Sequence, residues 1–165
     1  MVVAIIALVV SVSSLTWQIV LYLLGGARVR TELHIGALGA GTLAVHAPVG
    51  KPVDFAHLAQ QGFDQPVFAV KARNAGRLAV SITKWDIAFD NGGACSYPQW
   101  DANNDRPLPY RLEPGDEVVW YCPAAPIRAA IDAFAAAGLP VRVLQAQVGL
   151  GGTGKTVTSK NALRV

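Results

Sequence analysis

The chain has 165 residues, of which 52% are hydrophobic, and its formal net charge is +3 at pH 7. Its nine arginines and five lysines are scattered, with no basic run longer than Arg28-Val29-Arg30. Nucleic-acid binding needs a clustered basic face with aromatic side chains on which bases stack, so we expect no nucleic-acid partner.

The first predicted element is the stretch from Val2 to Leu24, which contains 23 residues and no charged side chain. As a helix it would be about 34 Å long, and the hydrocarbon core of a bilayer is about 30 Å thick. We therefore expect a transmembrane anchor at residues 1–27, embedded in membrane lipid. The remaining residues, 28–165, have the length of one folded domain.

Two alternatives exist for this stretch. A cleaved signal peptide would use Gly25-Gly26-Ala27 as its cleavage site, but such a peptide has a basic segment before a shorter apolar core. A helix in the core of a soluble protein is usually amphipathic, whereas this stretch has no charged face. A membrane anchor therefore fits its length and composition best.

One face of the predicted helix carries small and polar side chains at three- and four-residue spacing. They are Ala4, Ala7, Ser11, Ser14 and Gln18. Such a seam lets two helices approach closely in lipid, and a glutamine amide can bond across the contact. A homo-oligomer formed through this helix is one interpretation. The other is that the hydroxyls bond to carbonyls of their own helix.

Basic residues near the membrane predict the orientation of the anchor. Arg28 and Arg30 follow the apolar stretch closely, and no Lys or Arg precedes it. The positive-inside rule then favours a single-pass protein of the cell membrane with a cytoplasmic domain. A difference of two residues leaves the extracytoplasmic alternative open.

The domain is predicted to be mainly β. Short runs of β-branched and alternating residues predict strands at 28–35, 42–46, 67–73, 78–83, 85–89, 117–122, 141–148 and 155–159. Glycine and asparagine predict turns at 36–41, 74–77 and 90–93, the second of which would join two strands as a hairpin. We therefore expect one antiparallel immunoglobulin-like β-sandwich with a single crossing helix.

That crossing helix is predicted at residues 126–138. Its apolar face consists of Ile127, Ala130, Ile131 and Phe134. Gly138, which is followed by Leu139 and Pro140, should end it. A shorter helix is expected near residues 54–61, inside an otherwise irregular segment.

Three runs of sequence carry a resemblance to known proteins: VFAVKARNAGRLAVSITKWDIAF, LPYRLEPGDEVVWYC and VRVLQAQVGLGGTGKTVTS. With these strand and turn signatures, the chain resembles a loosely defined set of uncharacterised membrane proteins of bacteria, commonly actinobacteria, and of their phages. The resemblance covers most of the domain. It implies an N-terminal membrane helix followed by a small immunoglobulin-like sandwich, and it implies no catalytic residues.

Residues 149–156 match the phosphate-binding pattern GxxxxGK[ST] at every required position. A phosphate-binding loop must open a helix, and a later strand must supply an acidic residue for Mg²⁺. Here the β-branched pair Val157-Thr158 follows, and no acidic residue occurs after Asp132. We therefore predict a glycine-rich hairpin turn, and an anchored nucleotide-dependent enzyme remains a remote alternative.

Other signals for chemistry are incomplete. Residues 101–105 begin like a calcium loop, but Arg106 stands where the glycine should be and Leu112 where the bidentate glutamate should be. The spacing of the three histidines and two cysteines fits no metal site. No local pattern for a catalytic nucleophile is present. We expect no bound metal, no cofactor and no enzymatic activity.

Two aromatic side chains and two cysteines remain as candidates. Tyr97 and Trp100 lie in a proline-flanked connection and are candidate contacts for a partner protein, although local packing is the alternative. Trp120 is predicted to belong to the core. Cys95 and Cys122 could form a disulfide if the domain is exported, and should be thiols in a reducing cytosol.

These features predict a non-enzymatic single-pass membrane protein whose sandwich binds an unidentified partner protein at the membrane face. The alternative is a small membrane-active effector that oligomerises through the polar seam.

Overall fold

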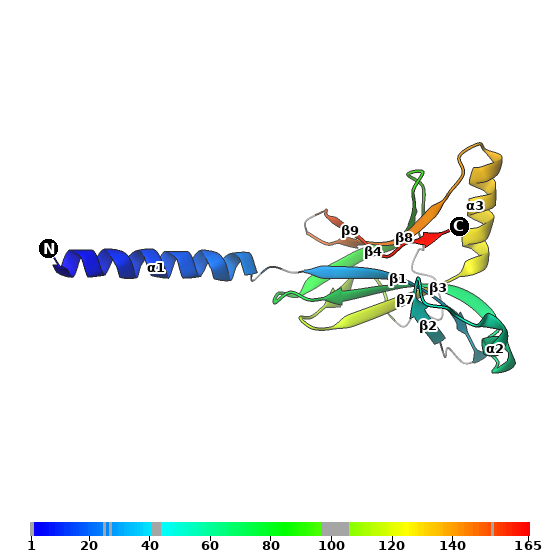
Figure 1. Cartoon of the computed structure of the whole chain (residues 1–165), viewed down its shortest axis with the longest axis horizontal. Helices are drawn as coiled ribbons and strands as arrows, with labels where there is room; N and C mark the ends of the chain where they lie inside the picture. The colour runs from blue at the N-terminus through cyan, green and yellow to red at the C-terminus, as the bar shows by residue number, and fades with distance from the viewer. Residues whose placement is uncertain (1, 25, 27, 41–43, 97–105, 153) are drawn as a thin grey trace.

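A computed structural model of the chain describes residues 2–24, 26, 28–40, 44–96, 106–152 and 154–165. These residues form three helices and ten strands, which follow one another in the chain as shown in Figure 1. The helices are α1 (Val2–Leu24), α2 (Phe55–Gln60) and α3 (Ala124–Ala136). The strands are β1 (Val29–Leu38), β2 (Ala44–Pro48), β3 (Gln65–Asn74), β4 (Val80–Phe89), β5 (Ala94–Ser96), β6 (Tyr110–Leu112), β7 (Glu117–Pro123), β8 (Val143–Leu150), β9 (Thr156–Thr158) and β10 (Leu163–Arg164).

The strands form two antiparallel sheets. The first sheet has the order β2-β1-β3-β7, and the second has the order β10-β8-β4-β5. Strand β6 also pairs with β4, and β9 also pairs with β8. The prediction of a mainly β domain with two antiparallel sheets is therefore confirmed.

The hydrophobic core lies between the two sheets. Trp120 of β7 and Trp85 of β4 stack across it, with ring centroids 6.3 Å apart. Val118, Trp120 and Cys122 alternate along β7 and are fully buried, as a strand with one face toward the core requires. The prediction that Trp120 belongs to the core is confirmed.

The predicted hairpin at residues 67–83 is wrong. Strand β3 belongs to the first sheet and β4 to the second, so the turn after Asn74 carries the chain from one sheet to the other. The two strands predicted at 78–83 and 85–89 are one strand, β4, with an irregular register between Ile82 and Lys84. Two long strands with a tight turn favour a hairpin locally, but core packing places them in different layers.

The predicted glycine-rich turn at residues 36–41 also begins too early. Strand β1 continues through Gly36 to Leu38 and pairs there with both β2 and β3. A Cβ atom at Gly36 would collide with the backbone carbonyl oxygen of Val45. The glycine is needed for this close approach of β2, and it does not end the strand.

Both soluble helices form where local signals predict them. The carboxylate of Asp54 accepts a hydrogen bond from the backbone N–H of His57 at 3.0 Å and so caps α2. Helix α3 begins at Ala124, two residues earlier than predicted, and Gly138 follows its end with a φ of +77°. Ile127 of α3 is fully buried, and Phe134 packs edge-on against Phe89.

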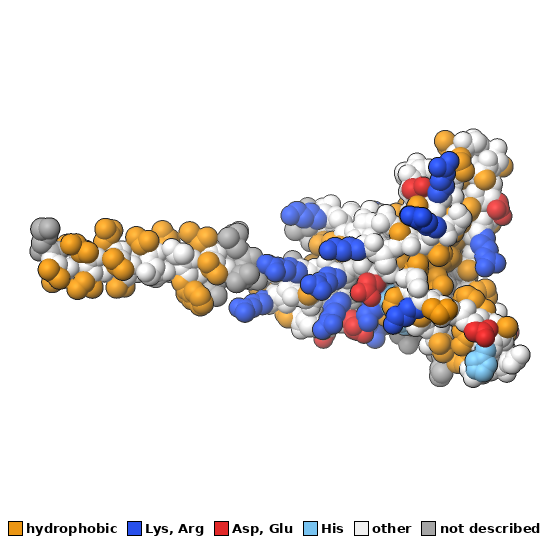
Figure 2. Space-filling view, viewed as in Figure 1, with side chains coloured by type: hydrophobic (Ala, Val, Ile, Leu, Met, Phe, Trp, Pro, Cys, Tyr) orange, Lys and Arg blue, Asp and Glu red, His pale blue; other side chains and the backbone are white. Residues whose placement is uncertain are grey.

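Helix α1 projects from the domain (Figure 1). From Val2 to Val20 it is long and apolar enough to cross a membrane, and its side chains are exposed. Figure 2 shows hydrophobic side chains along this helix, and Lys and Arg side chains over the adjacent end of the domain. Helix α3 lies at the far end (Figure 1).

Candidate functional site

The predicted seam residues all lie on α1. Ala4, Ala7, Ser11, Ser14 and Gln18 are exposed. The Ser11 hydroxyl donates to the carbonyl oxygen of Ala7 at 2.8 Å. This hydroxyl is therefore satisfied inside its own helix, as the alternative interpretation of the seam supposes.

The predicted partner contacts Tyr97 and Trp100 lie outside the described residues, as does the calcium-like segment 101–105. Cys95 of β5 is half-buried and Cys122 of β7 is buried, and both are thiols in the structure. They belong to different sheets but pack against the same core. Burial raises the pKa of the Cys95 thiol because the thiolate loses its hydration.

The segment that matches a phosphate-binding loop is a β-hairpin, as predicted. It joins β8 to β9, and the backbone N–H of Leu150 donates to the carbonyl oxygen of Lys155 at 2.8 Å. A strand follows Lys155, where a phosphate-binding loop needs the N-terminus of a helix. The Lys155 side chain is exposed on this hairpin.

A more informative feature is the free edge of β1. The Ala75 N–H donates to the Arg28 carbonyl oxygen, and in the register of β1 with β3 these two residues are opposite each other. Hydrogen-bonded pairs alternate in an antiparallel ladder. The backbone groups of even-numbered residues therefore point toward β3, and those of Val29, Thr31 and Leu33 point the other way.

On that other side, β2 covers only part of β1. The pairing begins at His34 opposite Pro48, and the N–H of Val49 still donates to the carbonyl oxygen of Leu33 at 3.1 Å. The chain then turns away, since the N–H of Lys51 bonds back to the carbonyl oxygen of Pro48. The edge of β1 at Val29–Thr31 therefore has no hydrogen-bonded strand among the described residues.

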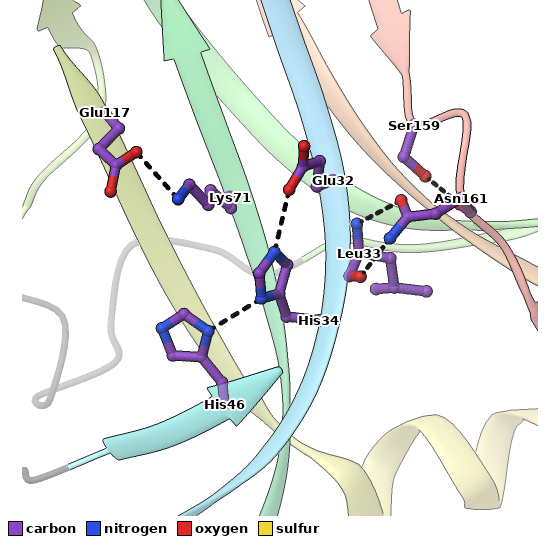
Figure 3. Close-up of polar contacts among 8 residues, drawn as sticks. All are labelled: Glu32, Leu33, His34, His46, Lys71, Glu117, Ser159 and Asn161. Atoms are coloured by element: carbon purple, nitrogen blue, oxygen red, sulfur yellow. Dashed lines mark hydrogen bonds and ion pairs between the residues drawn. The ribbon is translucent and has the colours of Figure 1, made fainter. Parts of the chain in front are cut away.

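Asn161 takes the place of a strand at the next position. Its side-chain oxygen accepts from the N–H of Leu33 at 2.9 Å, and its side-chain nitrogen donates to the carbonyl oxygen of Leu33 at 2.6 Å. Figure 3 shows both bonds reaching one residue of β1. The buried hydroxyl of Ser159 holds this segment by donating to the backbone carbonyl of Asn161 at 2.7 Å. The amide thus supplies the donor and acceptor that a strand residue would supply.

A groove of about 530 Å³ runs along the uncovered edge. Its walls come from β1, the end of β2 and the β9 segment, and include Val29, Thr31, Val157 and Thr158. Thr31 is 5% exposed, and its side-chain hydroxyl is the one buried side-chain polar atom without a partner among the described residues. Native proteins rarely leave such a group unpaired.

The charged residues of the groove favour an acidic ligand. Arg30 and Lys160 line it and are exposed, and Glu32 is its one acidic lining residue. The Glu32 carboxylate is already engaged, since it accepts from Nε2 of His34 at 3.2 Å. The groove lining therefore carries two positive charges and one negative charge, a small positive excess.

A second polar cluster lies on the outer face of the first sheet (Figure 3). Nδ1 of His34 and Nδ1 of His46 are 3.0 Å apart, a contact that requires one nitrogen to carry a hydrogen and the other to accept it. Tyr121 packs beside His46, with ring centroids 5.6 Å apart. Nearby, Lys71 pairs with Glu117 at 2.9 Å.

Burial and two neighbouring side chains lower the pKa of His46. The pKa of His46 lies below its ordinary value of 6.5, first because burial disfavours the imidazolium and then because His34 and Lys71 repel it. Lys71 also lowers the pKa of Glu117 by hydrogen bonding and attraction. The cluster is therefore arranged to hold His46 neutral.

The described residues include no group of three His, Cys, Asp or Glu side chains that could hold a metal ion. A smaller hollow of about 300 Å³ lies near α2 and is lined by Phe55, Phe63 and Arg128. It is formed by different residues from the groove beside β1.

Sequence reasoning did not find the β1 edge. Thr31 reads as an ordinary strand residue, and Asn161 follows the last predicted strand without any motif. Their role depends on the register of β1 and on where β2 leaves it, both of which are long-range properties of the fold.

Comparisons of the chain with models of protein families, with curated proteins and with solved structures found no match.

Proposed function

We propose that the chain is a single-pass membrane protein whose β-sandwich domain binds a partner protein at the membrane face without catalysing a reaction. In this proposal α1 crosses the bilayer, and the two-sheet domain is an immunoglobulin-like sandwich, as the resemblance to anchored proteins of bacteria and phages implies. The observation that carries the proposal is the apolar, unburied α1.

Helix α1 would be unfavourable in water. Its exposed large hydrophobic residues are Val2, Val3, Ile5, Ile6, Leu8, Val9, Val10, Val12, Leu15, Trp17, Ile19 and Val20. Contiguous apolar surface of this extent marks a membrane or protein interaction site. Each such aliphatic residue favours insertion at the centre of a bilayer by about 0.3–0.6 kcal/mol, so their sum supports a membrane location.

Basic residues support a cytoplasmic domain. Arg28 and Arg30 follow α1 directly, and Arg77 lies in the turn whose Ala75 N–H bonds to the Arg28 carbonyl oxygen. Figure 2 shows Lys and Arg side chains over this end of the domain, and others over the far end. Cytoplasmic flanks of membrane helices are enriched in Lys and Arg.

The position of the groove supports a partner at the membrane face. Val29 lines the groove, and only residues 25–28 separate β1 from α1. Four residues span at most about 14 Å. A groove on this short tether would be accessible to proteins in or beside the same membrane.

The anchor is tested by fractionating cells that express either the full chain or residues 28–165. We expect the full chain to stay with the membranes after alkaline carbonate extraction, and the shortened chain to be soluble. Recovery of the full chain in the soluble fraction without detergent, or its release by carbonate, would contradict the proposal.

A second candidate function is an oligomerising membrane-active effector. It is favoured by the exposed small and polar side chains on one face of α1, which make no contact with the domain. The paired variants Gln18→Leu and Ile19→Leu separate the two functions. If the seam mediates association, Gln18→Leu reduces cross-linking of the full chain in membranes and Ile19→Leu does not; equal cross-linking would argue against the effector.

A further inference from the structure

We propose that the domain binds its partner by strand addition: an extended acidic peptide pairs with the open edge of β1 at Val29–Thr31. This inference rests on the proposed function and deepens it, because it identifies the chemistry that the partner presents. The peptide would lie in the groove beside β1 and continue the line of β2.

The first argument comes from the backbone. The N–H and C=O groups of Val29 and Thr31 point away from β3, and no strand in the described part of the chain is hydrogen-bonded to them. Extended peptides bind such edges because the backbone hydrogen bonds form whatever the peptide sequence.

The second argument comes from Asn161. Its amide makes the two bonds to Leu33 that a residue of an adjacent strand would make. The chain thus completes the edge at Leu33 with a side chain and leaves the next positions toward α1 open. The added peptide strand would therefore pair with β1 at the positions beyond Leu33, toward α1.

The third argument comes from the side chains that a guest strand would meet. Alternate residues of a strand point to opposite faces. One set would face the groove lining at Val29, Thr31 and Val157, where an apolar side chain fits. The other set would emerge beside Arg30 and Lys160, which favour carboxylates.

A second copy of the chain fits this edge poorly. Two β1 strands paired antiparallel would direct their N-terminal ends, and therefore their α1 helices, in opposite directions. Both helices could not then enter one membrane from the same side. Edge-to-edge pairing of two copies would also bring Arg28 and Arg30 of each near those of the other. The occupant we infer is therefore a segment of a different protein.

The test uses the full chain in phosphatidylcholine nanodiscs and two synthetic probes, acetyl-EVEVEV-amide and acetyl-KVKVKV-amide. Binding is measured by fluorescence anisotropy, and the site is located by hydrogen–deuterium exchange. We expect the glutamate peptide to bind roughly tenfold more tightly than the lysine peptide. We also expect it to slow exchange of the Val29 and Thr31 amides.

A charge-reversed variant provides the specificity control. In Arg30→Glu/Lys160→Glu the preference should shift to the lysine peptide. The matched variant Arg128→Glu/Arg164→Glu changes the net charge equally, at exposed positions outside the groove, and should keep the preference for the glutamate peptide. Circular dichroism spectra of both variants should match that of the unmodified chain.

Several results would overturn the inference. Equal binding of the two peptides, or no binding of either at millimolar concentration, would contradict it. So would protection from hydrogen exchange only at residues outside the β1 edge. Protection of Val29 and Thr31 that depends on protein concentration and needs no peptide would assign the edge to a second copy. The membrane anchor is judged independently. A full chain that stays in the nanodisc but fails these tests removes strand addition alone, whereas a chain that leaves the nanodisc yet binds the peptide removes the anchor alone.

Discussion

The side-chain amide nitrogen of Asn74 donates to the backbone carbonyl oxygen of Leu112 at 3.2 Å and to that of Leu78 at 2.8 Å. Its side-chain oxygen accepts from the N–H of Gly76 at 2.9 Å. Asn74 ends a strand of the first sheet, whereas Leu112 belongs to β6, which pairs with the second. One fully buried amide therefore joins the two sheets at the crossover between them.

We predict that Asn74→Ala destabilises the domain by about 2–3 kcal/mol, because three backbone groups lose a partner and the bond to Leu112 is buried from water. The measurement is the free energy of unfolding of residues 28–165 in urea. Asn91→Ala is the matched control: Asn91 bonds in the same way to Gly93 and Leu139, but at an exposed turn. Asn91→Ala should lower the free energy of unfolding by less than about 1 kcal/mol. Equal decreases for the two variants would contradict the role of Asn74.

The second prediction concerns the hairpin at residues 149–156. Lys155→Ala should change stability by less than about 0.5 kcal/mol, because Lys155 is exposed on a hairpin. Gly154→Ala should cost about 1–2 kcal/mol, because Gly154 has a φ of +63° that alanine adopts with strain. Calorimetry with ATP and GTP should detect no binding. A nucleotide affinity that Lys155→Ala abolishes would show that the segment binds phosphate.

The third prediction is a loss of stability on acidification. The pKa of His46 is lowered from 6.5 in the folded domain, so the unfolded chain takes up this proton at a higher pH than the folded domain does. Linkage then requires stability to fall as the pH drops below about 6.5. The Glu117 carboxylate, whose pKa is lowered from 4.5, adds a second decline as the pH falls through its acidic range.

Thermal unfolding between pH 7.5 and 4 separates these two declines. The variant His46→Gln should lose the decline just below pH 6.5 and keep the more acidic one. His57→Gln, at an exposed position of α2, should keep both. If His46→Gln and the unmodified domain show the same pH profile, His46 does not control this response.

The fourth prediction concerns the orientation of the domain. A cytoplasmic domain should contain Cys95 and Cys122 as thiols. A membrane-impermeant maleimide should then label neither residue in intact cells. Because Cys122 is buried, both should be labelled after lysis in denaturant without a reducing agent, and Cys95→Ser should remove one label.

Labelling that needs prior reduction would instead mean an exported domain with a disulfide. In the chain-entropy model, closing the loop of about 28 residues between these cysteines would stabilise the domain by roughly 3–4 kcal/mol. The cytoplasmic orientation would then be wrong.

Local signals in the sequence predicted local structure well. The short helix near residues 54–61, the turn at Asn91-Gly92-Gly93 and the end of α3 at Gly138 each depend on a few neighbouring residues, and each forms as expected. The same is true of the β8–β9 hairpin, because its glycines and β-branched residues act over a short distance.

Long-range pairing could not be predicted in the same way. Asn74 reads as a turn residue whether the next strand returns to the same sheet or crosses to the other, and only packing of the core decides between them. Gly36 reads as a turn until the backbone of Val45 is placed beside it. The open β1 edge becomes visible only when the register of three strands is known.

The short segment between α1 and β1 would also govern how the domain meets its partner. The Arg28 carbonyl is fixed to Ala75 by a hydrogen bond, so the ordered domain begins within about 14 Å of the end of α1. For a protein embedded in a bilayer, such a tether confines encounters to a thin layer and replaces diffusion in three dimensions by lateral diffusion in two. A weak strand-pairing contact then operates at a high effective concentration, and a partner segment held close to the same bilayer gains an advantage over an identical peptide free in solution.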